Sequence, residues 1–310
     1  MAKGKPKGPI KPMNPEKIQM STERLLDFIQ SQNFGSIEEI NEFMSKNVVG
    51  KKIDEVIPEI SPSVTNQQKA NDLMYDAYDN PPAKAKKMAT EALKLDPENV
   101  RALNFLADHE KSAEAALKLY QKAMECGKKQ LGEKFFKENK GQFWAMIETR
   151  PYMSARLGFA HCLEDLEWND EAIREYNELL ELNPGDNQGV RYALASMLLF
   201  TRNYKQFGKL YQKYTDEESA FWLFNYALYL FATEGPTPKA NNALLLADEA
   251  NPYVIEFMTQ HEKMISDPEG YYSPGDKNEA AYYLMDNFRA WMNVENTLNW
   301  LLSFREIKKK

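Results

Sequence analysis

Three things are scarce in this 310-residue sequence, and each scarcity excludes a class of protein. Only two cysteines occur, Cys126 and Cys162, which rules out a disulfide framework and suits a reducing compartment. Glycine contributes only 14 residues, which disfavours a turn-rich sheet protein and favours packed helices. The most apolar stretch, Ala220 to Ala232, is too short to cross a bilayer and contains Asn225. The sequence therefore predicts an all-α protein that does not enter a membrane.

The N-terminus lacks an apolar run after its lysines, so we expect no signal peptide and a cytoplasmic location. Charge is unevenly spread. The formal net charge is −7, yet residues 1–12 carry +4 and residues 305–310 carry +3, which leaves −14 on the chain between them. An acidic body argues against a nucleic-acid groove, because phosphate binding needs a basic stripe on the folded domain. We expect residues 1–20 to be a solvated, disordered tail; the alternative is a tether to RNA, a ribosome or an acidic partner.

Motifs for metal binding, nucleophilic catalysis and phosphate binding are missing. The three histidines, His109, His161 and His261, do not have the spacing of a helical ligand pair, and neighbouring His161 and Cys162 point in different directions on a helix. The sequence has no phosphate-cradling glycine loop and no serine elbow. We therefore predict no metal site and no cofactor, and interpret the cysteines as core residues.

What the sequence does contain is a recurring pattern of small and aromatic residues. Segment 153–186 has Ala160 and Ala172 twelve residues apart, then Tyr176 and Pro184. Each helix of a packed pair needs a small residue where its partner crosses, and the aromatic ring fills the gap toward the next pair. Proline then ends the second helix. This spacing predicts a tetratricopeptide repeat.

Partial matches on both sides extend the pattern to five helix pairs, which predicts an all-α tetratricopeptide-repeat superhelix, or α-solenoid. The predicted segments are a basic tail at 1–20, an N-terminal helical extension at 21–62, helix pairs 1 and 2 at 63–127, an aromatic insertion at 128–150, helix pairs 3 to 5 at 151–252, and a C-terminal helical cap with a basic tail at 253–310. Within the extension, Ser21 and Ser36 each have a glutamate two or three positions later, which predicts a helix start at each serine. Because the insertion is rich in aromatic residues, we expect it to pack against the repeats.

Four sequence blocks add a resemblance to this pattern. LMYDAYD, FWAMIETRPYMSARLGFAHCL, ELLELNPGDNQGVRYAL and YYSPGDKNEAAYYL follow one another in that order. The chain resembles a largely bacterial, uncharacterised group of tetratricopeptide-repeat proteins that carries the same blocks, with ETRPYM and NPxDNQGxRY as its signatures. The resemblance covers about residues 60–302. It implies the repeat fold and no established reaction.

Two of these blocks mix arginine, tyrosine and carboxylate side chains at expected helix starts. Pro151 fits the first turn of one helix and Asp186 the cap of a later one, so most of the composition is typical of helix starts. Helix starts do not explain Arg156 and Arg191, because such repeats more often have a bulky apolar residue at these two positions. They indicate either a partly buried arginine and carboxylate network that fixes the stacking of the repeats, or a small anion pocket. Further members of that pocket would be Arg150, Asn187 and Gln188.

The first helices of the pairs present an aromatic face, and it lacks the lysines and arginines that would clamp a carboxylate. Apolar patches of this kind normally bury something. A peptide or helix from a partner could dock there, or the chain's own C-terminal helices could cover it with Phe288, Trp291 and Trp300. We interpret the face as partly self-filled.

The predicted function is a non-catalytic protein–protein interaction module, or scaffold, that binds a peptide or helix of a partner on this concave face. Two alternatives stay open: an enzyme or enzyme subunit that binds an anionic ligand at the arginine and tyrosine cluster, and a factor tethered to RNA or ribosomes by the basic N-terminus. The candidate binding residues are Arg150, Tyr152, Arg156, Asn187, Gln188, Arg191, Tyr192, Ser196, Phe200, Phe224 and Asn225.

Overall fold

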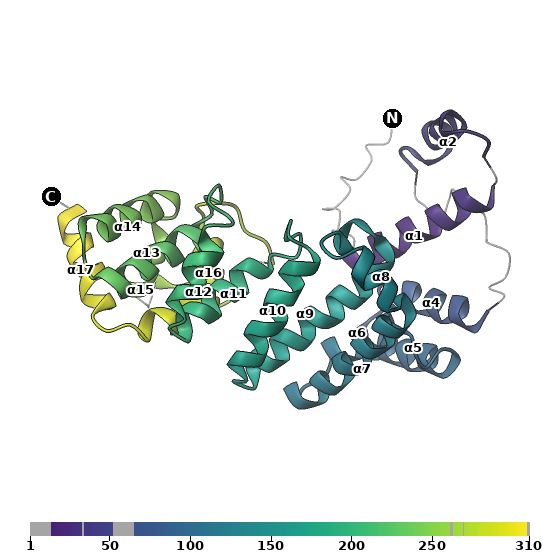
Figure 1. The fold of residues 1–310 in the computed structure, drawn as a ribbon, viewed down its shortest axis with the longest axis horizontal. Helices are drawn as coiled ribbons and strands as arrows, with labels where there is room; N and C mark the ends of the chain where they lie inside the picture. The colour runs from purple at the N-terminus through teal and green to yellow at the C-terminus, as the bar shows by residue number, and fades with distance from the viewer. Residues whose placement is uncertain (1–13, 33, 52–64, 261–262, 269, 309–310) are drawn as a thin grey trace, which may run out of the picture. The chain divides into compact units, whose positions relative to one another are not determined.

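The computed structural model of the chain is all-helical, as predicted (Figure 1). It describes residues 14–32, 34–51, 65–260, 263–268 and 270–308. Within those ranges it has sixteen α-helices, one short π-helix and two 3-10 turns, and no strand.

The chain forms two compact units, Met1–Cys162 and Leu163–Lys310, and the boundary between them falls inside the helix α9 (Arg150–Asp165). Unit 1 holds α1 to α8 and most of α9, and unit 2 holds the end of α9 and α10 to α17.

The helical elements of unit 1 before α9 are α1 (Pro15–Ser31), α2 (Ile37–Phe43), η1 (Met44–Val48), α4 (Asn66–Ala77), α5 (Pro82–Leu95), α6 (Val100–Asp108), α7 (Ala113–Leu131), α8 (Glu133–Glu138), η2 (Phe143–Ala145) and η3 (Ile147–Thr149). Short polar residues start several of these helices. Thr65 and Gln68 form a capping box at α4, and the side chains of Asn99 and Ser112 accept backbone hydrogen bonds at the starts of α6 and α7.

The helices of unit 2 after α9 are α10 (Asn169–Leu182), α11 (Val190–Phe200), α12 (Tyr204–Tyr211), α13 (Ala220–Glu234), α14 (Pro238–Ala250), α15 (Tyr253–Thr259), α16 (Lys277–Met292) and α17 (Thr297–Lys308). Consecutive helices pack against one another from α10 to α14, and α16 packs against both α11 and α13. Helices α9 to α14 therefore occupy the segment in which the sequence predicts pairs 3 to 5.

Small residues sit where neighbouring helices touch, which is why these helices pair. In unit 1, Ala70 and Ala77 of α4 are fully buried, as are Ala89 and Ala92 of α5, and all four belong to one core cluster. A methyl group at each crossing lets the two backbones approach closely. At Gly158 of α9 the contact is so close that even a methyl group does not fit, because a Cβ atom there would lie 2.3 Å from the ring of Tyr120 on α7.

Two predicted boundaries are wrong. The first helix begins at Pro15 and not at Ser21, because the Asn14 side chain accepts hydrogen bonds from the backbone N–H groups of Glu16 and Lys17. Residues 15–20 of the predicted tail are therefore helical, while its residues 1–13 lie outside the described residues. The second helix starts after Ser36, as predicted.

The other wrong boundary is that of the aromatic insertion. Helix α7 continues to Leu131, so the insertion begins near Gly132 and not at 128; Gly132 has a φ of 83°, which favours glycine. The insertion packs as predicted. Phe143 is fully buried, with ring centroids 4.9 Å from Phe136 and 6.3 Å from Tyr152.

Candidate functional site

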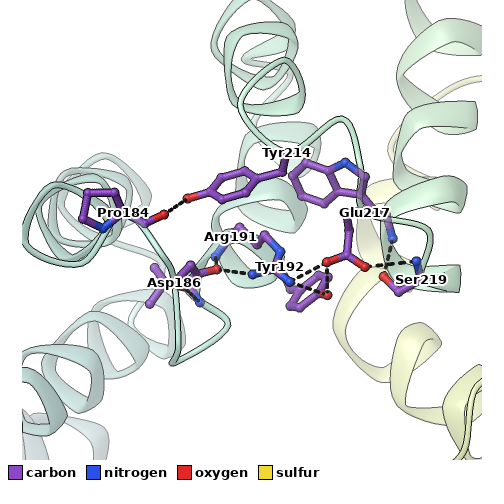
Figure 2. Close-up of polar contacts among 9 residues, drawn as sticks. Pro184, Asp186, Arg191, Tyr192, Tyr214, Glu217 and Ser219 are labelled. Carbon is purple, nitrogen blue, oxygen red and sulfur yellow. Dashed lines mark hydrogen bonds and ion pairs between the residues drawn. The ribbon is translucent and has the colours of Figure 1, made fainter. Parts of the chain in front are cut away.

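The arginine and carboxylate cluster at the start of α11 is built around Asp186 (Figure 2). Its carboxylate accepts hydrogen bonds from the backbone N–H groups of Val190, at 2.7 Å, and Arg191, at 3.0 Å. Asp186 therefore caps α11 as predicted, although the residue before the helix is Gly189, with a φ of 72°. The Arg191 guanidinium also donates to Asp186, at 3.0 Å.

A second carboxylate, Glu217 in the turn before α13, meets the other end of the same guanidinium (Figure 2). Arg191 Nη2 lies 2.5 Å from Glu217 Oε2, and the Tyr192 hydroxyl donates to the same oxygen at 2.8 Å. The other oxygen of Glu217 accepts a hydrogen bond from the backbone of Ser219, at 3.0 Å. The rings of Tyr192 and Tyr214 also lie against the guanidinium, 4.4 and 5.4 Å from it.

The pKa values of the two carboxyl groups shift in opposite directions. Asp186 has a side chain only 1% exposed, and burial raises its pKa although the N–H groups and charge of Arg191 oppose the shift. Glu217 is 19% exposed. Burial acts to raise the pKa of Glu217 too, but hydrogen bonds from Tyr192 and Arg191 outweigh it and lower the pKa. Burial acts to lower the pKa of Arg191, and Glu217 and Asp186 raise it on balance.

This geometry favours the structural interpretation of Arg191. One guanidinium faces two carboxylates, so an incoming anion would meet a net negative charge and would have to replace existing hydrogen bonds. The cluster ties together the turn before α11 and the turn before α13. Of the other predicted pocket members, Asn187 is exposed and Gln188 half-buried in the same turn.

Three predicted site residues lie in unit 1 and are described there. Arg156 donates to the Tyr152 hydroxyl at 3.0 Å, and Tyr152 itself is buried. The Arg150 Nε donates to the Trp144 carbonyl at 3.1 Å, and its guanidinium lies 5.0 Å from the Trp144 ring. Arg150 therefore ties the start of α9 to the aromatic insertion. Arg156 and Arg191 belong to different units, so their predicted proximity stays a prediction.

The remaining predicted residues belong to α11 and α13, and most lie beneath α16. Ser196 donates to the carbonyl of Asp286 on α16 at 2.7 Å. Phe224 and Asn225 are fully buried, and the Asn225 side chain accepts a hydrogen bond from Tyr283 at 3.0 Å. Phe200, at the end of α11, is half-buried, with the guanidinium of Arg289 on α16 4.5 Å from its ring.

Aromatic side chains complete this cover. Trp291 of α16 is fully buried and donates to the Tyr283 hydroxyl at 2.7 Å, and Trp300 of α17 stacks on Phe231 at 4.3 Å. Phe288, the third aromatic residue predicted for this cover, is 40% exposed. The structure therefore supports the self-filled interpretation for the α11 and α13 face.

A second covered face, which was not predicted from the sequence, lies in unit 1. Helix α1 runs antiparallel to α4, since its residues Lys17, Ser21 and Arg24 meet α4 residues in reverse order. Lys17 pairs with Asp79 just beyond the end of α4, Ser21 lies 3.2 Å from the Tyr75 hydroxyl, and Arg24 lies 3.2 Å from Asp72. The charged ends of Lys17 and Arg24 each lie 4.3 Å from the Tyr75 ring.

The opposite edge of α1 is acidic and meets α6 and α9. Glu23 lies 2.5 Å from Arg101 of α6, and Glu16 accepts a hydrogen bond from Ser154 of α9 at 3.4 Å. Burial raises the pKa of Glu16, and the Arg101 charge opposes this shift. We name the surface that receives α1 the α1-docking face and define it by Asp72, Tyr75, Asp79, Arg101 and Ser154.

A signal for this face was present in the sequence. Glu16 and Glu23 are seven residues, or about two helical turns, apart, as are Lys17 and Arg24, so each pair marks one edge of the helix.

A groove of about 1350 Å³ lies in unit 2 among α13, α14 and α17. Stacked Phe231 and Trp300 line it together with Leu245 and Phe304. Several of its amide groups are hydrogen-bonded within the chain: Asn241, for example, accepts a hydrogen bond from Trp300 at 2.7 Å. The groove therefore offers apolar walls without a cluster of charge.

The described residues contain no group of three or more histidine, cysteine or acidic side chains arranged to hold a metal ion. Both cysteines are buried, and they form no disulfide within the described residues. No helix in the described part of the chain has the length and apolar character needed to span a membrane. The proposed basic tether at residues 1–12 lies outside the described residues.

No protein-family model matches this chain, and no curated protein matches it. The resemblance to the tetratricopeptide-repeat group therefore stays a prediction that rests on the sequence blocks and on the packing of the helices.

Proposed function

We propose that this protein is a non-catalytic interaction module of the tetratricopeptide-repeat type, and that it binds a helix of a partner protein on the α1-docking face. The observation that carries the proposal is that this face already receives a helix, α1, largely through ion pairs and hydrogen bonds, and that the acidic partners Asp72 and Asp79 on the face are partly exposed. Such contacts are typical of surfaces that exchange one partner for another, because each is worth little on its own.

The repeat type is supported by three features. The small residues that define the pattern are buried at helix contacts, successive helices pack in chain order, and the aromatic Tyr176 is fully buried. The interaction role is supported by comparison of the two faces. The α11 and α13 face is sealed by apolar side chains of α16, so the α1-docking face is the better candidate for a partner.

Partner capture from the native host, followed by calorimetry with the purified candidate, tests this proposal. A true partner should lose at least about tenfold in affinity, or ~1.4 kcal/mol, for the Asp72→Lys, Asp79→Lys variant. The Glu110→Lys, Glu133→Lys variant makes the same charge change at exposed residues of unit 1 and is the control. Equal affinity for all three proteins would place the interface elsewhere, and turnover of a small anionic ligand would favour the enzyme alternative.

A further inference from the structure

Helix α1 presents two edges of opposite charge to its docking face. Lys17 and Arg24 meet the acidic residues Asp79 and Asp72, while Glu23 on the other edge meets Arg101. The ion pairs on the α4 side are two helical turns apart, so a helix shifted by one turn or reversed in direction would lose them. The face therefore selects a helix by direction, register and charge.

We infer that α1 is an internal competitor at this face, and that the partner is an amphipathic helix with the same two-edged charge pattern, which binds by displacing α1. This inference rests on the function proposed above and adds the chemistry of the partner and the device that regulates access to it.

The buried side of α1 explains why it can be displaced. Its core contacts are Met20 and Leu25, and beside them Lys17, Gln19 and Ser21 are buried polar side chains. Polar groups exchange their partners for water with little net change in free energy, whereas apolar burial is what holds a helix permanently.

Helix α16 shows the contrasting case. Its buried residues are mostly apolar and include Tyr283, Leu284, Ala290 and Trp291. A helix docked in this way belongs to the core of its unit. Helix α1 resembles a ligand more than a core element.

The pattern on α1 defines the partner helix. Relative to Lys17, it has a second basic residue seven positions on at Arg24, and a small polar residue four positions on at Ser21. Each basic residue directly follows a glutamate, and apolar residues occupy the positions of Met20 and Leu25. The expected motif therefore begins with Glu-Lys, followed by three residues of which the third is apolar. A small polar residue and then any residue come next. The motif ends with Glu-Arg and an apolar residue.

A labelled synthetic peptide of residues 14–32 tests the inference in fluorescence anisotropy with the full chain. The unmodified chain should bind it weakly, because its own α1 competes at high effective concentration. The Lys17→Glu, Arg24→Glu chain repels its own α1 from Asp79 and Asp72, so it should bind the peptide about tenfold more tightly, given that two partly exposed ion pairs are lost. The control is the Lys84→Glu, Lys87→Glu chain, which changes exposed lysines of α5 and should bind like the unmodified chain.

A charge swap gives the second arm. The Asp72→Lys, Asp79→Lys chain should prefer a peptide that carries Lys17→Glu and Arg24→Glu over the unmodified peptide. Circular dichroism checks that each variant keeps its helices, and Lys17→Gln with Arg24→Gln replaces the charge reversal if that chain unfolds. Equal peptide binding by the variant and unmodified chains, or no change of preference on charge swap, would overturn the inference.

Sedimentation of the unmodified chain tests the remaining outcome, in which a second copy of the chain occupies the face. If it forms a concentration-dependent dimer that the Asp72→Lys, Asp79→Lys change abolishes, a second copy is the occupant and a foreign partner is ruled out. A captured partner that binds while the peptide arms fail would overturn only this inference. Peptide exchange without any partner would instead remove support from the proposed function.

Discussion

Arg191 joins parts of unit 2 that are distant in sequence. Its guanidinium reaches Asp186 five residues before it and Glu217 twenty-six residues after it, and its backbone is capped by Asp186. A buried ion pair adds little stability compared with apolar packing, but removal of one partner leaves the others uncompensated. The three residues therefore act as one unit.

Arg191→Ala should destabilise the protein by about 3 to 5 kcal/mol, because the nearly buried Asp186 and the partly buried Glu217 lose their counter-charge. Chemical denaturation measures the change. The matched control is Arg174→Ala, whose pair with Glu171 is exposed to solvent, so its loss should change the stability far less. A stable Arg191→Ala protein that loses only an anionic ligand would instead establish the pocket.

Glu217 gives a pH-dependent prediction. Its pKa is lowered in the folded state, so its contribution to stability is present above its unfolded pKa and is lost as the pH falls through the folded value. Glu217→Gln should therefore cost about 1 to 3 kcal/mol at pH 7, the range for hydrogen bonds to charged groups. The difference from the unmodified protein should shrink as the pH falls below 4.5, the ordinary pKa of a glutamate. Urea denaturation across this window tests it, and a difference independent of pH would contradict it.

The positions of the helices were easier to predict from the sequence than the contacts that each helix makes with distant parts of the chain. The helix pairs follow from local rules, since small residues such as Ala160 and Ala172 have the spacing of a helix pair and are buried. The Asp186 cap also follows from local sequence. The docking of α1 does not, because Arg24 and Glu23 find partners 48 and 78 residues away, and a charged helix reads from sequence as a solvated extension. Glu217 was missed for the same reason.

The substitution Gly158→Ala tests how closely α7 and α9 approach each other within unit 1. Glycine is unfavourable inside a helix, so Gly158→Ala without other effects would stabilise α9 by roughly 1 kcal/mol. A Cβ atom would, however, lie 2.3 Å from the ring of Tyr120, which is buried and donates a hydrogen bond to Asp108. We expect a loss of about 1 to 3 kcal/mol, the usual cost of overpacking. Thermal unfolding gives the sign directly, and a raised melting temperature would show that the ring moves aside freely.

The two units cover their inner faces in different ways, and this difference is the basis of the proposed function. In unit 2, α16 buries aromatic and aliphatic side chains against α11 and α13, and cannot leave without exposing Phe224 and Trp291 to water. In unit 1, α1 is held mainly by charges, which become hydrated when it leaves. Stability is therefore expected to be uneven along the chain, with α1 at the low end.

Hydrogen exchange followed by mass spectrometry tests this order. Amides of α1 should exchange faster than those of α16, and the gap should widen when NaCl is raised from ~0.05 M to ~1 M, where the screening length falls to about 3 Å. Ion pairs such as Arg24 with Asp72 are then screened, while apolar contacts are not weakened. Helix α5, with Ala89 and Ala92 fully buried, is the internal control for unit 1. If α1 were protected as well as α5 at both salt concentrations, it would be part of the core, and a partner helix would find no face to occupy.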